Sequence, residues 1–320
     1  MPATAASSGW EGYWREDRLA ACMPDDPSSS ARIEADWRYF FASLGKMSSV
    51  LDVATGNGVL LVWASQESKR RGLDLALSGI DLADIDPRSF LKEFGSDLAD
   101  VRFEGKTSAE ALPFEKESFD VLISQYGLEY AGLEAALAEA ARVLKPGGRL
   151  RWLAHASDSA IVRQGRAQLQ EADLLLAKSG PFAMMDEFLD ANSRGAKVGR
   201  ATRRLTEALK KAEAFCRDNP GATLVPQLCK GILDTANNLP RYRSEDVANW
   251  LGENRRRLHA QRARLRDLDT AALGAERRNR VARLLCSPLW EETEFAELRS
   301  ADGEISLGLC IEARRGGPPD

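Results

Sequence analysis

The sequence predicts a doubly wound α/β fold, in which helices cover both faces of a mostly parallel sheet. Short apolar runs alternate with helix-forming segments over residues 50–150, as buried strands and helices do in such a sheet. A glycine-containing turn at residues 54–58 follows the first apolar run and opens a helix. The second apolar run ends at an acidic residue, Asp81, which is typical of strands that hold a nucleotide-like ligand at their carboxyl ends.

The turn after the first predicted strand has the features of a ligand-binding loop. Residues 50–60 read Val-Leu-Asp-Val-Ala-Thr-Gly-Asn-Gly-Val-Leu. Gly56 and Gly58 have no Cβ, so the backbone can bend tightly and a ligand can lie against it. The amides that open the next helix favour an anionic group. A dinucleotide-binding turn needs a small residue where Leu61 stands, which weakens that interpretation, and a tight turn without a ligand remains the alternative.

The elements after this turn follow in the order of a doubly wound sheet. We predict a helix at 59–71, strands at 75–80, near 101–103 and at 118–124, a helix at 133–144 and a strand at 149–154. Gln125 and Tyr126 leave the fourth strand, and His155 leaves the fifth. Reacting groups in open α/β sheets gather at this edge, so these side chains are candidates for a site.

Three motifs resemble those of class I S-adenosylmethionine (SAM)-dependent methyltransferases. Residues 52–58 follow the acidic-x-Gly-x-Gly-x-Gly pattern, except that Ala54 replaces the first glycine. Residues 108–114, Ser-Ala-Glu-Ala-Leu-Pro-Phe, are close to the family's Asp-Ala-Glu-x-Leu-Pro-Phe, and residues 144–148 match its Leu-Lys-Pro-Gly-Gly. The chain is most similar to the small-molecule, menaquinone/ubiquinone-type branch. The resemblance implies a Rossmann-like methyltransferase fold with seven strands, and SAM as the cofactor.

The resemblance assigns the cofactor site to the carboxyl ends of the strands. Asp81 would accept both ribose hydroxyls, although it could instead be a solvated carboxylate at the end of its strand. Asp52 would hold the methionyl amino group, although it could instead only tether the glycine turn by hydrogen bonds. Ser108 stands where the family has an acid that binds the adenine amino group, so it is a weaker acceptor. The residues expected to contact SAM are Asp52, Ala54, Thr55, Gly56, Asn57, Gly58, Asp81, Leu82, Ser108, Ala109, Glu110, Gln125 and Tyr126.

Methyl transfer from a sulfonium needs alignment and exclusion of water, and requires neither a nucleophile triad nor a metal. We therefore expect no metal site. A general base would help if the acceptor is a hydroxyl. His155 is the first candidate, Glu129 and Tyr130 are the others, and the alternative is that His155 only ends its strand. His259 lies among arginines and is assigned to the surface.

Residues 1–45 are predicted to form a helical lid segment. Trp10, Tyr13 and Trp14 place three aromatic residues within five positions. In the family that the chain resembles, an N-terminal helix lies over the cofactor, so Tyr13 and Trp14 are candidate lid residues. Aromatic residues in such positions are also typical of an ordinary core.

The chain is predicted to contain a large helical insertion before its last two strands. Residues 46–158 form the predicted SAM-binding core, and a hairpin at 291–315 completes its sheet. Residues 159–290 read as helical, and we expect them to form a cap that selects the substrate and shields the reaction from solvent. The homodimer that a seven-residue leucine spacing permits, at Leu251, Leu258 and Leu265, is less favoured than ordinary helix packing.

Charge is unevenly distributed along the chain. The net charge is −4, but residues 193–284 carry 21 Lys and Arg against 10 Asp and Glu, a local balance of +11. This asymmetry indicates either an acidic partner or solvated helix faces that pack on an acidic domain, and we favour the second.

Composition and termini favour a cytoplasmic protein. No apolar run approaches the length needed to cross a bilayer, so no membrane span is expected. Residues 1–9 lack the basic start and apolar stretch of a secretory signal. The five cysteines are scattered, which predicts reduced thiols.

The leading functional prediction is a SAM-dependent methyltransferase that acts on the O, N or C of a small-molecule substrate. A second possibility is an RNA or protein methyltransferase that uses the basic insertion. Nucleic acid is disfavoured, because the chain lacks the Asn/Asp-Pro-Pro-aromatic signature and any RNA-binding module. A third is a non-catalytic binding or scaffold protein with a methyltransferase fold.

Overall fold

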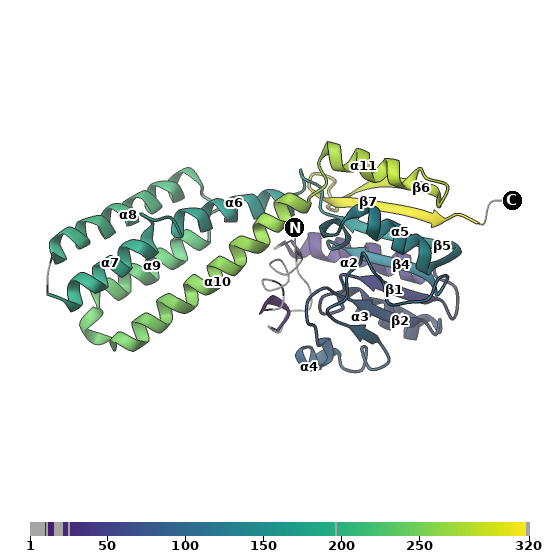
Figure 1. Cartoon of the computed structure of the whole chain (residues 1–320), viewed down its shortest axis with the longest axis horizontal. Helices are drawn as coiled ribbons and strands as arrows, with labels where there is room; N and C mark the ends of the chain where they lie inside the picture. Colours follow the sequence, from purple (N-terminus) through teal and green to yellow (C-terminus); the bar gives the residue numbers. More distant parts are fainter. Residues whose placement is uncertain (1–9, 11, 16–21, 25, 196, 318–320) are drawn as a thin grey trace. The chain divides into compact units, whose positions relative to one another are not determined.

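A computed structural model describes residues 10, 12–15, 22–24, 26–195 and 197–317. The chain divides into two compact units (Figure 1). The first, named the core unit, comprises Met1–Arg163 and Asp267–Asp320, and the second, named the helical unit, comprises Gln164–Arg266.

The core unit contains a seven-stranded sheet with the order β3-β2-β1-β4-β5-β7-β6. The strands are β1 (Ser49–Val53), β2 (Ala76–Ile80), β3 (Arg102–Glu104), β4 (Phe119–Gln125), β5 (Leu144–Ala154), β6 (Trp290–Arg299) and β7 (Ser306–Arg315). Strands β1 to β5 pair in parallel, whereas β7 is antiparallel to both β5 and β6. The doubly wound, mostly parallel sheet is therefore confirmed. Strand order reverses at β1, where the carboxyl ends of neighbouring strands border the usual binding crevice.

Helices cover both faces of this sheet. They are α2 (Pro27–Ala42), α3 (Val59–Arg71), α4 (Pro87–Phe90), α5 (Leu133–Val143) and α11 (Ala275–Leu285), with 3-10 turns at Lys92–Phe94 and Leu128–Tyr130. Successive strand residues point to opposite faces. Val50 is accordingly buried with residues of α2 and α3, while Leu51 is buried with residues of α5 and α11. Both faces are apolar, which explains the continuous apolar runs in the sequence.

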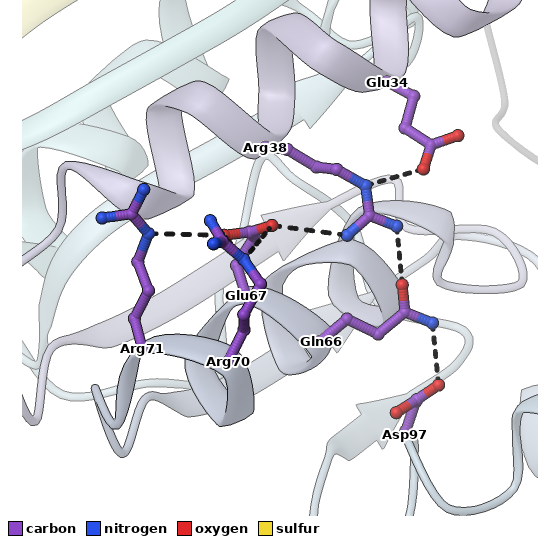
Figure 2. Close-up of polar contacts among 7 residues, drawn as sticks. All are labelled: Glu34, Arg38, Gln66, Glu67, Arg70, Arg71 and Asp97. Carbon is purple, nitrogen blue, oxygen red and sulfur yellow. Dashed lines mark hydrogen bonds and ion pairs between the residues drawn. The ribbon is translucent and has the colours of Figure 1, made fainter.

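A polar network joins α2 to α3 (Figure 2). Glu67 of α3 is buried, accepts hydrogen bonds from Arg70, and pairs with Arg71 and with Arg38 of α2. The hydrogen bond from Arg70 is the main reason that the pKa of Glu67 lies below its ordinary value of 4.5. Arg38 also donates hydrogen bonds to Glu34 and Gln66, and the side-chain amide of Gln66 donates to Asp97. The network fixes the helix that begins at the glycine turn.

The helical unit has a separate apolar core. Its helices are α6 (Ala160–Leu175), α7 (Pro181–Ser193), α8 (Val198–Asp218), α9 (Leu224–Asn237) and α10 (Ser244–Ala271), with a 3-10 turn at Leu239–Arg241; α6 begins and α10 ends in the core unit. Leu251 and Leu258 are buried in this unit's own core, as ordinary helix packing requires. A homodimer through this surface stays a prediction. No helix in the described ranges combines the length and apolarity needed to span a membrane.

The helical unit spans fewer residues than the predicted insertion. The prediction covered residues 159–290, whereas the compact unit ends at Arg266. Val281 and Leu285 of α11 are buried in the same core as α5 and β5, so α11 covers the sheet. The sequence of α11 is as rich in arginine as the insertion, so composition did not separate the two.

Candidate functional site

The turn between β1 and α3 is held in a left-handed backbone conformation at three positions. Ala54, Gly56 and Gly58 have φ values of 59°, 53° and 82°. Glycine adopts this conformation freely, whereas alanine does so at a cost of roughly 1–2 kcal/mol. The end of β4 contacts the turn, because a Cβ on Gly127 would lie 2.4 Å from the Cβ of Ala54. The conformation of the turn therefore lets neighbouring backbone lie in close contact with it.

Two buried carboxylates stand at the adjoining carboxyl ends of β1 and β2. Asp52 Oδ2 accepts a hydrogen bond from Thr55 Oγ1 at 2.7 Å, while its buried Oδ1 has no hydrogen-bond partner among the described residues. Asp81 accepts from the amides of Gly56 and Ala83, each at 2.8 Å. Burial, and then the charge of Asp81, raises the pKa of Asp52 to about 8, and burial raises that of Asp81 to about 6. Both pKa values lie near neutral pH, so a ligand that changes the surroundings of these groups can change their charge.

The N-terminal aromatic residues lie on this turn. The indole of Trp14 would be 2.4 Å from a Cβ on Gly56, so it rests directly against the bare glycine. The Trp14 carbonyl accepts a hydrogen bond from Asn57 Nδ2 at 3.0 Å. Trp10 and Tyr13 pack on Trp14, with ring centroids 6.1 and 5.1 Å away. The structure thus places Trp14 on the glycine turn and Tyr13 against Trp14.

A carboxylate–imidazole pair follows β4 and β5. Glu129 Oε1 lies 2.7 Å from His155 Nδ1 and also accepts from the His155 amide at 2.7 Å. Glu129 Oε2 accepts from Trp152 Nε1 at 2.9 Å. The Tyr126 ring stacks on the imidazole with centroids 4.5 Å apart, and the Tyr126 hydroxyl donates to the Leu307 carbonyl. Glu129 and His155 are both buried, so this geometry is fixed on every side.

His155 and Glu129 each favour the charged form of the other. Burial lowers the pKa of His155, but Cys22 and the Glu129 carboxylate beside the ring outweigh it and raise the pKa to about 9. Burial raises the pKa of Glu129, but the hydrogen bond and charge of His155 outweigh it and lower the pKa. His155 Nε2 is buried, and no group in the described part of the chain meets hydrogen-bond geometry with it. An imidazole with this pKa keeps its proton at pH 7, so it is a hydrogen-bond donor there and is poorly suited to act as a base.

Comparison with known proteins agrees with this geometry. A family model described as a methyltransferase domain matches residues 50–148. These residues are a class I SAM-dependent methyltransferase domain. The ubiquinone/menaquinone biosynthesis C-methyltransferase UbiE of Psychromonas ingrahamii is 37% identical over 36% of this chain and 46% of that protein. UbiE of Allorhizobium ampelinum is 31% identical over 45% of this chain and 48% of its own length.

The chain spans about half the length of these curated relatives. Among solved structures, a geranyl diphosphate C-methyltransferase from Streptomyces coelicolor is 18% identical, with a TM-score of 0.37 over 49% of this chain and 67% of that one. A SAM-dependent methyltransferase from Aquifex aeolicus is 23% identical, with a TM-score of 0.34 over 42% of this chain and 70% of that one.

The residues of the methyltransferase domain fit its cofactor, SAM. The unpartnered Asp52 Oδ1 is a buried acceptor that suits the ammonium at one end of SAM. Asp81 stands at the end of the adjacent strand, where hydroxyl groups of a ribose can reach it. The bare face of Gly56 suits close contact, although Trp14 covers it here.

The other predicted cofactor residues surround the same strand ends. Leu82 is 41% exposed. The Ser108 hydroxyl accepts from the Glu110 amide at 3.1 Å, and Ala109 packs on the apolar core. The Glu110 carboxylate accepts from the Gly132 amide at 2.7 Å. The polar group of Glu110 is therefore engaged in holding the start of α5.

Gln125 is also engaged within the protein. Its side-chain carbonyl accepts from Trp37 Nε1 at 2.7 Å, and its amide donates to the sulfur of Met23. A contact between Gln125 and SAM stays a prediction. The described residues contain no group of three or more His, Cys, Asp or Glu side chains placed to hold a metal.

Three further residues of the site carried no signal in the sequence. Cys22 lies beside His155, Trp152 donates to Glu129, and Arg277 Nη2 donates to the Glu129 carbonyl at 2.7 Å. They come from the N-terminal segment, from β5 and from α11. No motif links these segments, so only the folded chain shows that they meet around Glu129 and His155.

Replacing Asp52 with asparagine is expected to stabilise the free protein and weaken SAM binding. The pKa of Asp52 rises from 3.8 to about 8 on folding, so the folded state holds a proton that the unfolded chain releases between those values. Stability therefore falls as pH rises through this window, by up to about 1.4 kcal/mol per pH unit from this group. Asp52→Asn removes that contribution, because the amide cannot ionise.

Urea unfolding between pH 5 and 8 measures the slope, and calorimetric titration measures SAM affinity, which should fall by about tenfold or more. The exposed Asp100→Asn is the matched control. Equal slopes and equal affinities in wild type and Asp52→Asn would contradict the assignment.

The two histidines of the chain should titrate far apart in an NMR experiment. His155 is expected near pH 9. Burial, Arg262 and Arg255 lower the pKa of His259, which should titrate below 6.5. Glu129→Gln should lower the His155 midpoint by about one pH unit or more, because it removes the paired charge, and His259→Gln assigns the signals. A His155 midpoint below 6.5 in wild type would disprove the ion pair.

Proposed function

We propose that the chain transfers a methyl group from SAM to a small-molecule acceptor. The observation that carries this proposal is Asp52 Oδ1, an acceptor buried without a partner between the glycine turn and Asp81. Such an atom destabilises the fold by roughly 1–3 kcal/mol. A cationic ligand group that binds it would explain why it is retained. The names of the relatives, which are C-methyltransferases of quinone biosynthesis, support a small acceptor.

The side chains of the site have distinct tasks in this proposal. Asp52 would accept hydrogen bonds from the amino group of SAM, and Asp81 would accept from its ribose hydroxyls with the lone pairs that its two amide partners leave. Leu82 and Ser108 would meet the adenine. The bound cofactor supplies an activated methyl group. Alignment of acceptor and donor by the protein can lower the barrier by about 7–11 kcal/mol.

The N-terminal aromatic residues would act as a closing segment. Trp14 rests on the face of Gly56 against which SAM would lie, so the indole has to move before SAM enters. Tyr13 and Trp10 pack on Trp14 and would move with it. Closure of the segment over bound SAM would exclude water from the reaction.

The helical unit would select the acceptor. Its excess of arginine is a weak argument for nucleic-acid binding, because several of these arginines pair with carboxylates of the same unit. The pairs are Arg204 with Glu187, Arg255 with Asp186, and Arg262 and Arg266 with Asp173. Phosphate binding depends on cationic groups that are free to displace counterions.

A labelled-methyl experiment tests this function. The protein is incubated with methyl-labelled SAM and with separate small-molecule, RNA and protein fractions of a cell extract. Label should enter the small-molecule fraction, and Asp52→Asn should reduce the transfer by about tenfold or more. Label confined to RNA or protein would favour the macromolecular alternative. SAM that neither binds nor transfers its methyl would favour a scaffold.

Displacement of Trp14 should be visible in tryptophan fluorescence. SAM is expected to change the emission of the wild-type protein, because the indole leaves a buried position on Gly56. In Trp14→Phe the change should largely disappear while SAM still binds. Trp63→Phe, which alters a buried tryptophan of α3, is the control and should leave the response intact. An equal response in Trp14→Phe would refute the closing role.

A further inference from the structure

Near the cofactor turn, two buried hydrogen-bond donors find no partner of suitable geometry among the residues that the structure describes, although Cys22 lies beside both rings. They are Nε2 of His155 and the hydroxyl of Tyr130. Their rings meet edge to face, with centroids 5.9 Å apart. A buried donor without a partner costs roughly 1–3 kcal/mol. Two such donors in adjacent rings indicate a place where a ligand supplies the acceptor.

Both groups keep their protons. Glu129 holds His155 in the charged form from the Nδ1 side, which leaves the proton on Nε2 directed away from the pair. Burial raises the pKa of Tyr130 well above 10. The site therefore presents one charged and one neutral donor at neutral pH.

The same site has little to offer a cationic ligand. The Glu129 carboxylate beside the imidazole has its oxygens taken by the His155 ring, the His155 amide and Trp152. Its remaining charge is balanced by the imidazolium. An amine placed here would meet a positive charge and no free acceptor from this pair, whereas an anion would be stabilised.

The donors lie next to the cofactor turn, within the core unit. Trp10 packs edge to face on Tyr130 at 5.9 Å, and it stacks on Trp14, which rests on Gly56. Gly127, two residues before Glu129, abuts Ala54 of the turn. Aromatic rings thus surround the donors, and they favour an apolar body on the ligand.

We infer that the methyl acceptor is a carboxylic acid with an apolar body, whose carboxylate is bound by His155 and Tyr130. This inference rests on the proposed methyltransferase function and specifies its substrate class. His155 and Tyr130 bind the substrate, and Glu129 is a positioning residue that fixes the imidazole.

The chemistry of the step balances with these groups. One carboxylate oxygen is held by the donors, and the other attacks the methyl carbon. The new oxygen–carbon bond forms as the carbon–sulfur bond breaks, so the negative carboxylate and the positive sulfonium are neutralised together. The products are a methyl ester and a thioether, and no proton has to be removed.

A phenol or an amine suits the site less well. In a phenolate the held oxygen is the one that must attack, and attack through a ring carbon requires a base to remove the ring proton. An ammonium acceptor also has to lose a proton first. His155 is already protonated, so it serves none of these reactions.

A matched ligand series tests the inference with the full chain saturated with the demethylated cofactor product, S-adenosylhomocysteine. Phenylacetate, phenylacetamide and phenethylamine share one ring and differ in charge. Phenylacetate should bind about tenfold or more tightly than the amide, and the amine should not bind, by calorimetry. Tyr130→Phe and His155→Gln should each weaken phenylacetate binding by about tenfold and leave SAM binding unchanged.

Tyr130→Phe removes only a hydroxyl, so it tests the inference even if His155→Gln does not fold. His259→Gln is the matched control and should change nothing. Failure of phenylacetate to bind, equal binding of the three probes, or full affinity in Tyr130→Phe would overturn the inference. Failure of the wild-type protein to bind SAM would instead refute the proposed function.

The product supplies an independent test. Mild alkali hydrolyses methyl esters and releases labelled methanol, which is volatile, whereas methyl ethers, methylamines and C-methyl groups retain their label. Product from the extract experiment should lose its label to the vapour after this treatment. A product that retains its label would overturn the inference and leave the methyltransferase function intact.

Discussion

The site depends on the burial of Asp52 and Asp81 at the adjoining ends of β1 and β2. Burial in a low-dielectric interior raises the pKa of both carboxylates, and the charge of Asp81 adds to the rise at Asp52. The left-handed turn provides part of the compensation, through Thr55 and the amide of Gly56. One oxygen of Asp52 remains without compensation. The ligand-free core is therefore less stable than a core with an asparagine there, and a cationic ligand would recover that difference.

The second buried charge pair has the opposite character. Glu129 and His155 neutralise each other and satisfy most of each other's hydrogen-bonding groups. A buried ion pair fixes the positions of its two side chains more than it stabilises the fold, because the cost of removing both charges from water offsets much of their attraction. Its value lies in holding one imidazole nitrogen in a fixed direction next to the cofactor turn.

Much of the fold was predictable because the sheet is buried on both faces. Continuous apolar runs bounded by Gly, Pro and Asp located β1, β2 and β4 to within a residue or two, and α3 was predicted with its observed ends. The turn glycines and Asp81 could be identified because few residue types tolerate those backbone angles and positions. The prediction placed α11 in the helical insertion, because its apolar residues are buried with α5 and β5, which lie far earlier in the chain, as well as with Trp290 of the nearby β6.

For His155, Glu129 and Tyr130, the sequence predicted which residues lie at the site and not how they are protonated. His155, Glu129 and Tyr130 all follow strands, so their presence at one edge followed from topology. Their protonation did not, since the pKa of His155 depends on Cys22 and Glu129 from other segments. A general base at His155 stays a prediction, and the raised pKa of the ring in the folded protein favours a role as hydrogen-bond donor.

The contact between Trp14 and Gly56 has a consequence for how freely position 56 can vary. A glycine that is required for one reason only can often be replaced when a second substitution nearby compensates. At position 56 a methyl group would collide with the indole when the segment is closed on the turn, and with a nucleoside when one is bound there. A single neighbouring substitution cannot relieve both collisions, so this glycine is constrained twice over, by alternative occupants of one surface.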